Sequence, residues 1–347
     1  MINDNNCTLS RDDFKSDQEV KWCPGCGGHA VLSAIKNTLV NIGVQKEKVV
    51  FVSGIGCSSR FPYYINTYGF HSLHGRAPAV ATGIKLTNPE LSVWIVTGDG
   101  DSMAIGGNHF IHLLRRNIDI NIIIFNNQIY GLTKGQTSPT TPKGSITKTS
   151  PLGNFENPFN PGELTMGAQG TFFARAIDTD QNMMTEVFTA AAKHKGTSVV
   201  EVMQNCVIFN DKTHEQITSK DLKADNQIYL KHGMPMTFGK NNEKGLIRAG
   251  TKYLVVEIGK KGITIDDIMV HNARYADDTQ HYMLVRMTLP DLPVATGVIR
   301  DFSNTIYEDA LYNQIEFLKK NPKYKSLQDM FESGNVFEID NESSIND

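Results

Sequence analysis

The sequence lacks the features of a secreted, membrane or nucleic-acid-binding protein. No apolar run reaches the ~18 residues that a bilayer-spanning helix needs. Residues 1–20 are polar and acidic, without the apolar core of a secretory signal or the arginine-rich pattern of a transit peptide. The formal net charge of −3 over 347 residues gives no reason to expect nucleic acid or a membrane surface as a partner. These absences predict a cytoplasmic protein.

Cysteine is also scarce, with five residues in the whole chain. That is too few for a disulfide scaffold, and clustered thiols in a reducing compartment indicate metal or redox work instead. Cys23 and Cys26 form a C-x-x-C pair, but the second pair that a compact zinc site needs about 15–20 residues later is absent. The polar residues before Cys23 are no credible strand, which argues against a thioredoxin motif.

The first half of the chain alternates apolar runs with helical segments. The runs rich in Val and Ile predict strands at 48–53, 92–97, 120–125 and 197–203. The segments between them predict helices at 28–42, 77–86, 103–116 and 181–195. This alternation predicts an α/β fold, a parallel sheet with helices on both faces.

The domain organisation follows from where this pattern holds. Residues 1–20 form a polar arm, residues 21–225 the predicted cofactor domain, and residues 226–347 an extension with a helix at 305–319 and an acidic tail. Residues 132–162 form a long loop of Thr, Ser, Pro, Gly and Lys, which is typical of functional or disordered segments.

Short polar motifs follow each predicted strand. They are GIGCSSR (54–60), GDGD (98–101), NNQIYG (126–131) and QNC (204–206). Because the carboxyl ends of parallel strands share one edge of a sheet, these four motifs are expected to converge there. Cys57 and Cys206 would then join one edge, where four thiolates can hold zinc or an iron–sulfur cluster. Cys7, in the polar arm, is predicted to be a spectator.

Oxygen ligands are available at the same edge. Asp99 offers a carboxylate, Asn127 an amide oxygen and Ile129 a backbone carbonyl, a set that suits Mg²⁺ shared with phosphate oxygens. The helix expected after GDGD adds a dipole that favours an anion. The alternative is a plain strand-to-helix turn in which Asp99 caps the helix.

The GDG followed by Asn127 resembles the thiamine diphosphate motif. The resemblance implies that Asp99, Asn127 and the Ile129 carbonyl hold Mg²⁺. It further implies contact with the diphosphate from a second set of residues, namely Gly100, Asp101, Gly131 and Leu132. Asn126 is interpreted as structural.

Residues 15–225 resemble the β subunit of the 2-oxoacid:ferredoxin oxidoreductases, and the C-terminal extension resembles it more weakly. The resemblance rests on WCPGCG, GIGCSSR, FHSLHGRAPAVATG, GDGD, GGNHF, NNQIYGLTKGQ and the late NC, in this order. It implies a [4Fe–4S] cluster on Cys23, Cys26, Cys57 and Cys206. It also implies further cofactor contacts from Ile55, Gly56, Cys57, Ser58 and His74.

The family implies oxidative decarboxylation of a 2-oxoacid to an acyl-CoA and CO₂, with electrons leaving through the cluster. The overall sequence is most similar to the 2-oxoglutarate branch, which would give succinyl-CoA. Pyruvate remains an alternative, as do a non-redox decarboxylase subunit with structural zinc and a scaffold subunit with a vestigial cofactor loop.

Three further side chains are candidate catalytic residues. Arg60 and Lys134 follow predicted ligand loops and could meet a substrate carboxylate or the diphosphate, or instead pair with a partner chain. His74 is placed near cofactor and substrate by the resemblance. His109 and His112 are interpreted as structural.

Two expected features are missing. Thiamine enzymes normally use a Glu at the aminopyrimidine, and no convincing candidate is present. The C-x2-C-x2-C-x3-C-P run of a bacterial ferredoxin is also absent. The chain is therefore predicted to act with an α subunit, in an αβ unit that is doubled, and with coenzyme A and a separate ferredoxin.

Overall fold

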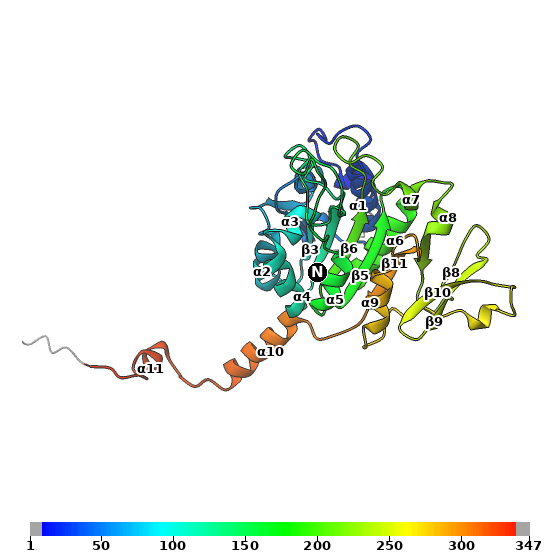
Figure 1. Cartoon of the computed structure of the whole chain (residues 1–347). Coiled ribbons are helices and arrows are strands. Elements are labelled where there is room, and N and C mark those ends of the chain that lie inside the picture. Colours follow the sequence, from blue (N-terminus) through cyan, green and yellow to red (C-terminus); the bar gives the residue numbers. More distant parts are fainter. Residues whose placement is uncertain (1–8, 338–347) are drawn as a thin grey trace, which may run out of the picture. The chain divides into compact units, whose positions relative to one another are not determined.

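The computed structural model describes residues 9–337 of the chain (Figure 1). The chain divides after Tyr307 into two compact units, and the first holds the predicted site. The second contains α11 (Leu327–Phe331) and nearly all of α10 (Tyr307–Lys320), which confirms the helix expected at 305–319. The end of the predicted acidic tail lies outside the described residues.

An eight-stranded sheet with the order β2-β1-β3-β4-β6-β5-β11-β7 forms the centre of the first unit. Neighbouring strands are parallel from β2 to β5, β11 is antiparallel to β5, and β7 is parallel to β11. The strands are β1 (Val49–Ser53), β2 (Tyr68–His71), β3 (Ser92–Gly98), β4 (Asn121–Asn126), β5 (Phe172–Ile177), β6 (Ser198–Met203), β7 (Gln227–Leu230) and β11 (Val294–Asp301). The four predicted strands are β1, β3, β4 and β6, which lie side by side, so the predicted α/β fold is confirmed.

Helices cover both faces of the sheet (Figure 1). They are α1 (Gly28–Ile42) and α6 (Gln181–Lys193) on one face, and α2 (Ala77–Thr87), α4 (Gly107–Arg116), α5 (Pro161–Gly167) and α9 (Thr279–Val285) on the other. Successive residues of a strand point to opposite faces, so each strand feeds two cores. In β1, Val50 and Val52 join the core under α2 and α4, whereas Val49 and Phe51 join the core under α1 and α6.

The helix predicted at 103–116 begins later, as α4, and a separate short helix, α3 (Asp99–Met103), ends where the prediction began. The chain folds tightly between them: a Cβ on Gly106 would lie 2.4 Å from the backbone oxygen of Asp101. Gly106 and Gly107 mark this break in the sequence, because adjacent glycines weaken a helix. As a result GDGD is itself the first turn of a helix.

The extension predicted from residue 226 contributes two strands, β7 and β11, to the main sheet. It also forms a small antiparallel sheet of β8 (Thr237–Phe238), β9 (Lys244–Ala249) and β10 (Lys252–Glu257). Two short helices, α7 (Glu215–Thr218) and α8 (Lys223–Asn226), lead into it.

The long loop at 132–162 contains no helix or strand before α5. Its first part is packed, because Ser138, Thr140 and Thr141 are buried. Its later part is open, with the side chain of Leu152 99% exposed. One half of the loop is therefore part of the folded site.

Strand β2 forms one edge of the main sheet, and all four of its residues are exposed. Tyr68 and Phe70 present aromatic side chains from this edge, and Leu73 follows them. Within residues 9–337, no helix is long and apolar enough to cross a bilayer.

Candidate functional site

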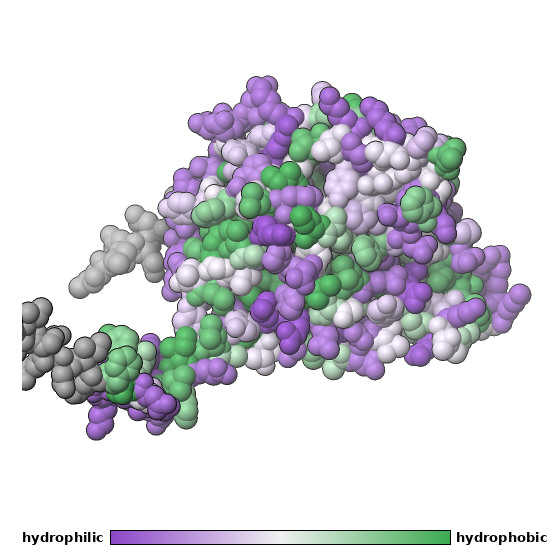
Figure 2. All heavy atoms as spheres, turned by 60° about the vertical axis from the view of Figure 1, so that its left-hand side comes forward, coloured by the Kyte–Doolittle hydropathy of each residue, from purple (hydrophilic) through white to green (hydrophobic). Residues whose placement is uncertain are grey.

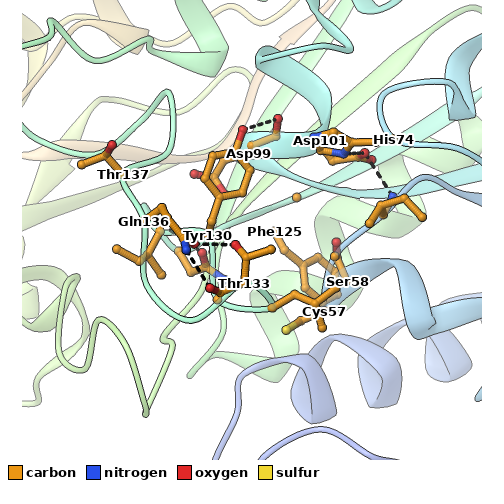
Figure 3. Close-up of a pocket in the computed structure, with 18 residues that line it drawn as sticks. Cys57, Ser58, His74, Asp99, Asp101, Phe125, Tyr130, Thr133, Gln136 and Thr137 are labelled. Atoms are coloured by element: carbon orange, nitrogen blue, oxygen red, sulfur yellow. Dashed lines mark hydrogen bonds and ion pairs between the residues drawn. The ribbon is translucent and has the colours of Figure 1, made fainter. Parts of the chain in front are cut away.

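The motifs that follow β1, β3 and β4 meet at a pocket of about 590 Å³. This confirms the convergence expected at the carboxyl edge of the sheet. The pocket is lined by Ile55, Gly56, Cys57, Ser58, His74, Gly98, Asp99, Gly100, Asp101, Phe125, Asn127, Ile129, Tyr130, Gly131, Leu132, Thr133, Gln136 and Thr137 (Figure 3). Every residue that the resemblance assigned to Mg²⁺ or the thiamine cofactor lines it.

Asp99 presents a buried carboxylate at the end of β3, only 2% exposed. Its Oδ2 accepts hydrogen bonds from the hydroxyls of Ser138 at 2.5 Å and Thr140 at 2.6 Å. Burial raises the pKa of Asp99 to about 6, against the opposing effect of these two hydroxyls. A divalent cation in the pocket would favour the ionised carboxylate, so the donor chemistry fits a hard metal ion.

Asp101 lines the pocket, and its contact with the diphosphate stays a prediction. Its carboxylate accepts hydrogen bonds from the Ile55 amide, the Gly75 amide and the Thr97 hydroxyl. The Nδ1 of His74 donates a further one at 2.7 Å (Figure 3). Because these donors come from separate segments, Asp101 ties the strand ends together. The residue borders the pocket, and its carboxylate oxygens accept hydrogen bonds from other parts of the protein.

The ring of Tyr130 leaves no room for a side chain at position 100, which is occupied by glycine. A Cβ on Gly100 would lie 2.1 Å from the Tyr130 ring, whose hydroxyl donates to the Gly100 carbonyl at 3.2 Å. Burial, followed by the charges of Asp99 and Asp101, raises the pKa of Tyr130 to about 12. The phenol therefore stays protonated and remains a hydrogen-bond donor beside the pocket.

The two asparagines at the end of β4 differ in what they contact. The Nδ2 of Asn126 donates to the buried Glu201 at 2.6 Å, and Glu201 also pairs with Arg175. This agrees with a structural role for Asn126. Asn127 lines the pocket, and its Nδ2 donates to the Oε1 of Gln204 at 3.0 Å.

Ser58 provides a test of whether a polar ligand fits here. Its hydroxyl is buried and has no hydrogen-bond partner within the described protein, yet the residue lines the pocket. A buried hydroxyl without a partner costs free energy unless a ligand or water satisfies it. The pocket thus offers an unmet hydrogen bond to a polar group such as a diphosphate.

A second cavity of about 300 Å³ adjoins the first and contains the cysteines. Four thiols line it, from Cys23, Cys26, Cys57 and Cys206, and all four are free. The two cavities share Cys57, Asn127, Gly131 and Leu132 as lining residues. The fifth cysteine, Cys7, lies outside the described residues.

The thiols surround a cavity rather than a single point. In residues 9–337, no three His, Cys, Asp or Glu side chains are grouped closely enough to hold one metal ion. A Cβ on Gly131 would lie 3.6 Å from the sulfur of Cys206 and 3.8 Å from that of Cys57. Burial, followed by the charges of the three neighbouring thiols, raises the pKa of Cys26 to about 11. Such thiols become good ligands only when bound iron or another cation offsets the buried charge.

Trp22 fixes the shape of the cysteine cavity. Its indole Nε1 donates to the backbone oxygen of Cys57 at 2.6 Å, and its ring packs edge-on against Tyr64. This contact joins the C-x-x-C segment to the motif after β1. Two of the thiol-bearing segments are thereby held together by the protein itself.

Arg60 and Lys134 line the cysteine cavity and are not among the residues lining the first pocket. The Nη1 of Arg60 donates to the backbone oxygen of Lys21 at 3.1 Å. Burial raises the pKa of Cys57, and the charge of Arg60 opposes that effect. Arg60 and Lys134 therefore lie beside the thiols, and neither side chain borders the pocket that contains Asp99.

Comparison with known proteins agrees with this geometry. Residues 54–202 match the family described as thiamine pyrophosphate enzyme, C-terminal TPP binding domain. The 2-oxoglutarate oxidoreductase subunit KorB of Mycobacterium tuberculosis is 49% identical over 305 residues, which cover 87% of this chain and 81% of that one. The chain belongs to the 2-oxoacid:ferredoxin oxidoreductase β-subunit family.

Other members of the family and one solved structure support the same placement. The 2-oxoglutarate synthase subunit KorB of Archaeoglobus fulgidus is 46% identical over 201 residues, covering 58% of this chain and 73% of that one. The 2-oxoglutarate:ferredoxin oxidoreductase of Magnetococcus marinus, solved with 2-oxoglutarate, coenzyme A and succinyl-CoA bound, superposes with a TM-score of 0.75. Its sequence identity is 29%, and the match covers 94% of this chain and 96% of that chain.

Sequence reasoning within this family missed four polar side chains of the site: Ser138, Thr140, Tyr130 and Gln204. Ser138 and Thr140 lie in the long loop, where a run of Ser and Thr looks like ordinary loop composition. Tyr130 and Gln204 stand inside quoted motifs but belong to no ligand pattern. For Tyr130 and Gln204, the only signal in the sequence was that they lie within these motifs.

Proposed function

We propose that this chain is the thiamine diphosphate-binding β subunit of a 2-oxoglutarate:ferredoxin oxidoreductase, with a [4Fe–4S] cluster of its own. The observation that carries the proposal is the shared wall between the two cavities. Cys57, Asn127, Gly131 and Leu132 border both of them. A carbon centre that gives up electrons in one cavity would then lie beside an acceptor in the other.

Mg²⁺ would be held by Asp99, the Oδ1 of Asn127 and the backbone oxygen of Ile129. The donor set supports this: one buried carboxylate and two neutral oxygens suit a cation that shares its shell with phosphate and water. The unpartnered hydroxyl of Ser58 would remain as a donor to a diphosphate.

Thiamine diphosphate, when bound, supplies a carbon nucleophile and an electron sink for decarboxylation. The chain's own residues bind and orient it. Gly100, Gly131 and Leu132 offer backbone and apolar contact, together with Ile55 and Gly56. His74 lines the pocket and is held through Nδ1 by Asp101, and its other ring nitrogen would serve as a proton donor or acceptor for substrate.

Four thiolates around a cavity fit an iron–sulfur cluster better than a structural zinc. Zinc needs its sulfurs about 2.3 Å from a single centre. The four thiols instead line, together with other residues, a cavity of about 300 Å³, and no three of them are grouped around one point in the described residues. Held by Cys23, Cys26, Cys57 and Cys206, such a cluster would supply one-electron chemistry beside the first pocket.

The choice of 2-oxoglutarate rests on the similar proteins, whose names specify 2-oxoglutarate in Mycobacterium, Archaeoglobus and Magnetococcus. Arg60 and Lys134 are proposed to meet the second carboxylate of this substrate. Because they line the cysteine cavity, that contact would form near the common wall. Pyruvate, with one carboxylate, is the second candidate substrate.

A partner α subunit is proposed to complete the site. No Glu lines the described pocket, so the acid that the aminopyrimidine requires would come from another chain. Leu73 and Ile105, both exposed apolar residues, flank His74 and Asp101 in sequence and mark a surface for that chain. The side that carries α2 and α3 faces the viewer in Figure 2, and apolar side chains gather there. Coenzyme A would bind mainly to the partner.

The test is anaerobic co-production of the chain with its α subunit, followed by analysis of iron, acid-labile sulfide, zinc and thiamine diphosphate. Viologen reduction is then assayed with coenzyme A and either 2-oxoglutarate or pyruvate. We expect a cluster on this chain, bound thiamine diphosphate and preference for 2-oxoglutarate. Zinc without iron would contradict the redox function, and faster turnover of pyruvate would contradict the substrate.

A further inference from the structure

We infer that Gln204 is a positioning residue that couples the proposed magnesium ligand Asn127 to the proposed cluster ligand Cys26. The inference rests on the proposed function. The Gln204 amide lies between the two side chains. Its Oε1 accepts from Asn127 Nδ2 at 3.0 Å, and its Nε2 donates to Cys26 Sγ at 3.2 Å.

The surroundings hold Gln204 in this place. The side chain is 2% exposed and follows directly after β6. Its backbone amide donates to the Asn126 carbonyl at 3.0 Å, so the main chain is fixed to the end of β4. A Cβ on Gly27 would lie 2.7 Å from Gln204 Cγ. A side chain at position 27 would therefore overlap Gln204, and would overlap the carboxylate of Asp178 more closely, at 2.0 Å.

The thiolate sets the direction of the whole chain of hydrogen bonds. A metal-bound sulfur can accept a hydrogen bond but cannot donate one, so the NH₂ end of Gln204 must face Cys26. The carbonyl end of Gln204 then faces Asn127, and it can accept only from the NH₂ end of that amide. The oxygen of Asn127 is left pointing away from Gln204. That is the atom which a magnesium ion requires.

Gln204 is expected to affect the cluster as well. A hydrogen bond to a ligating sulfur stabilises the more negative, reduced state, and so raises the reduction potential. One buried amide would thus hold the metal ligand in its binding orientation and make the cluster a better electron acceptor. Neither role requires Gln204 to touch substrate.

Two substitutions separate the roles in the αβ complex. Gln204→Glu keeps an oxygen for Asn127 but removes the donor to Cys26 and adds negative charge. We expect the cluster potential to fall by about 59 mV or more, a tenfold change in its one-electron equilibrium, while the Mg²⁺ concentration needed for thiamine diphosphate binding stays within about threefold. Gln204→Met removes both contacts, so the potential should fall and the Mg²⁺ requirement should rise about tenfold.

The measurements are an EPR-monitored redox titration and calorimetric thiamine diphosphate binding over a range of Mg²⁺ concentrations. Gln216→Glu is the control, because Gln216 is exposed and the change adds the same charge. Iron content and complex formation check folding. Unchanged potentials in both Gln204 variants at full iron content would overturn the inference and leave the proposed function intact. Wild-type complex without a cluster on this chain would overturn both.

Discussion

The hydroxyl of Ser138 donates a hydrogen bond of 2.5 Å to the buried carboxylate of Asp99, across 39 positions of sequence. Thr140 adds a second hydrogen bond to the same oxygen, and its hydroxyl also lies 2.9 Å from Asn126 Oδ1. The long loop thereby orients the one carboxylate that the proposed metal site possesses. Its packed half is a functional part of the pocket.

Replacing Asp99 should abolish metal-dependent cofactor binding. Asp99→Asn keeps the shape but removes the negative charge, and we expect thiamine diphosphate affinity in Mg²⁺ to fall by more than about 100-fold, beyond the loss typical of outer contacts. Calorimetry on the αβ complex measures it. Asp221→Asn, at an exposed site, is the control. Equal occupancy in the two variants would rule out Asp99 as a ligand.

Removing a loop hydroxyl should weaken the metal site less severely. Thr140→Val deletes the contacts to Asp99 and Asn126, and we expect about 10-fold to 100-fold weaker Mg²⁺ binding. Thr149→Val changes an exposed threonine of the same loop and should have no effect. If the two variants need the same Mg²⁺ concentration for cofactor binding, the loop does not orient the metal ligand.

The cysteines should divide into two groups. Replacement of any one of the four lining the cavity by Ser should lose or convert the cluster, since serine oxygen is a poor substitute for a soft thiolate. Cys7→Ser should leave iron content and the EPR spectrum unchanged. Iron that survives all four replacements would belong to another subunit, and a cluster lost only in the Cys7 variant would overturn the ligand set.

Gly100→Ala should destabilise the chain through Tyr130. The new Cβ would lie 2.1 Å from the ring, and relieving that overlap should cost about 1–3 kcal/mol in the free energy of unfolding. Gly83→Ala, in α2 with no atom within 4 Å of the new Cβ, should instead stabilise by about 0.5–1 kcal/mol. Urea unfolding of each variant gives both numbers. Adding Tyr130→Leu to Gly100→Ala should restore most of the loss.

Acidification should destabilise the fold through buried His271. Burial lowers the pKa of His271 to about 4, from 6.5 when unfolded. The unfolded chain therefore binds the proton first, and the stability contributed by neutral His271 is lost as pH falls from 6.5 towards 4. The slope is at most about 1.4 kcal/mol per pH unit. Urea unfolding across this pH range measures the effect. The free energy of unfolding should decline less steeply for His271→Gln than for the wild type, whereas His29→Gln, at an exposed site, should decline as the wild type does.

The central part of the fold could be predicted from the sequence because each central strand can be recognised from its own residues. The runs at β1, β3, β4 and β6 are rich in Val and Ile on both faces, which is typical of buried strands. β5 was missed because its sequence, FFARAI, contains Arg175. That residue is tolerated inside only because Glu201 on the neighbouring strand pairs with it at 2.7 Å. A partner 26 residues away cannot be read from the strand itself.

The pocket could be predicted in its residues but not in its hydrogen bonds. All residues named for Mg²⁺ and the thiamine cofactor line one cavity, because the segments that carry them follow strands whose ends are fixed. Asp101 was expected against the diphosphate, yet donors from the segments at 55, 74–75 and 97 occupy its oxygens. Which oxygen serves the protein and which serves a ligand depends on tertiary geometry.

The exposed edge strand β2 affects how the isolated subunit behaves during expression. A strand with unpaired backbone groups and aromatic side chains is a template on which another copy can add its own strand. A subunit synthesised without its α chain would offer Tyr68 and Phe70 to any neighbour at high concentration. We therefore expect single-subunit expression to give insoluble material, and translation of both chains together to reduce it.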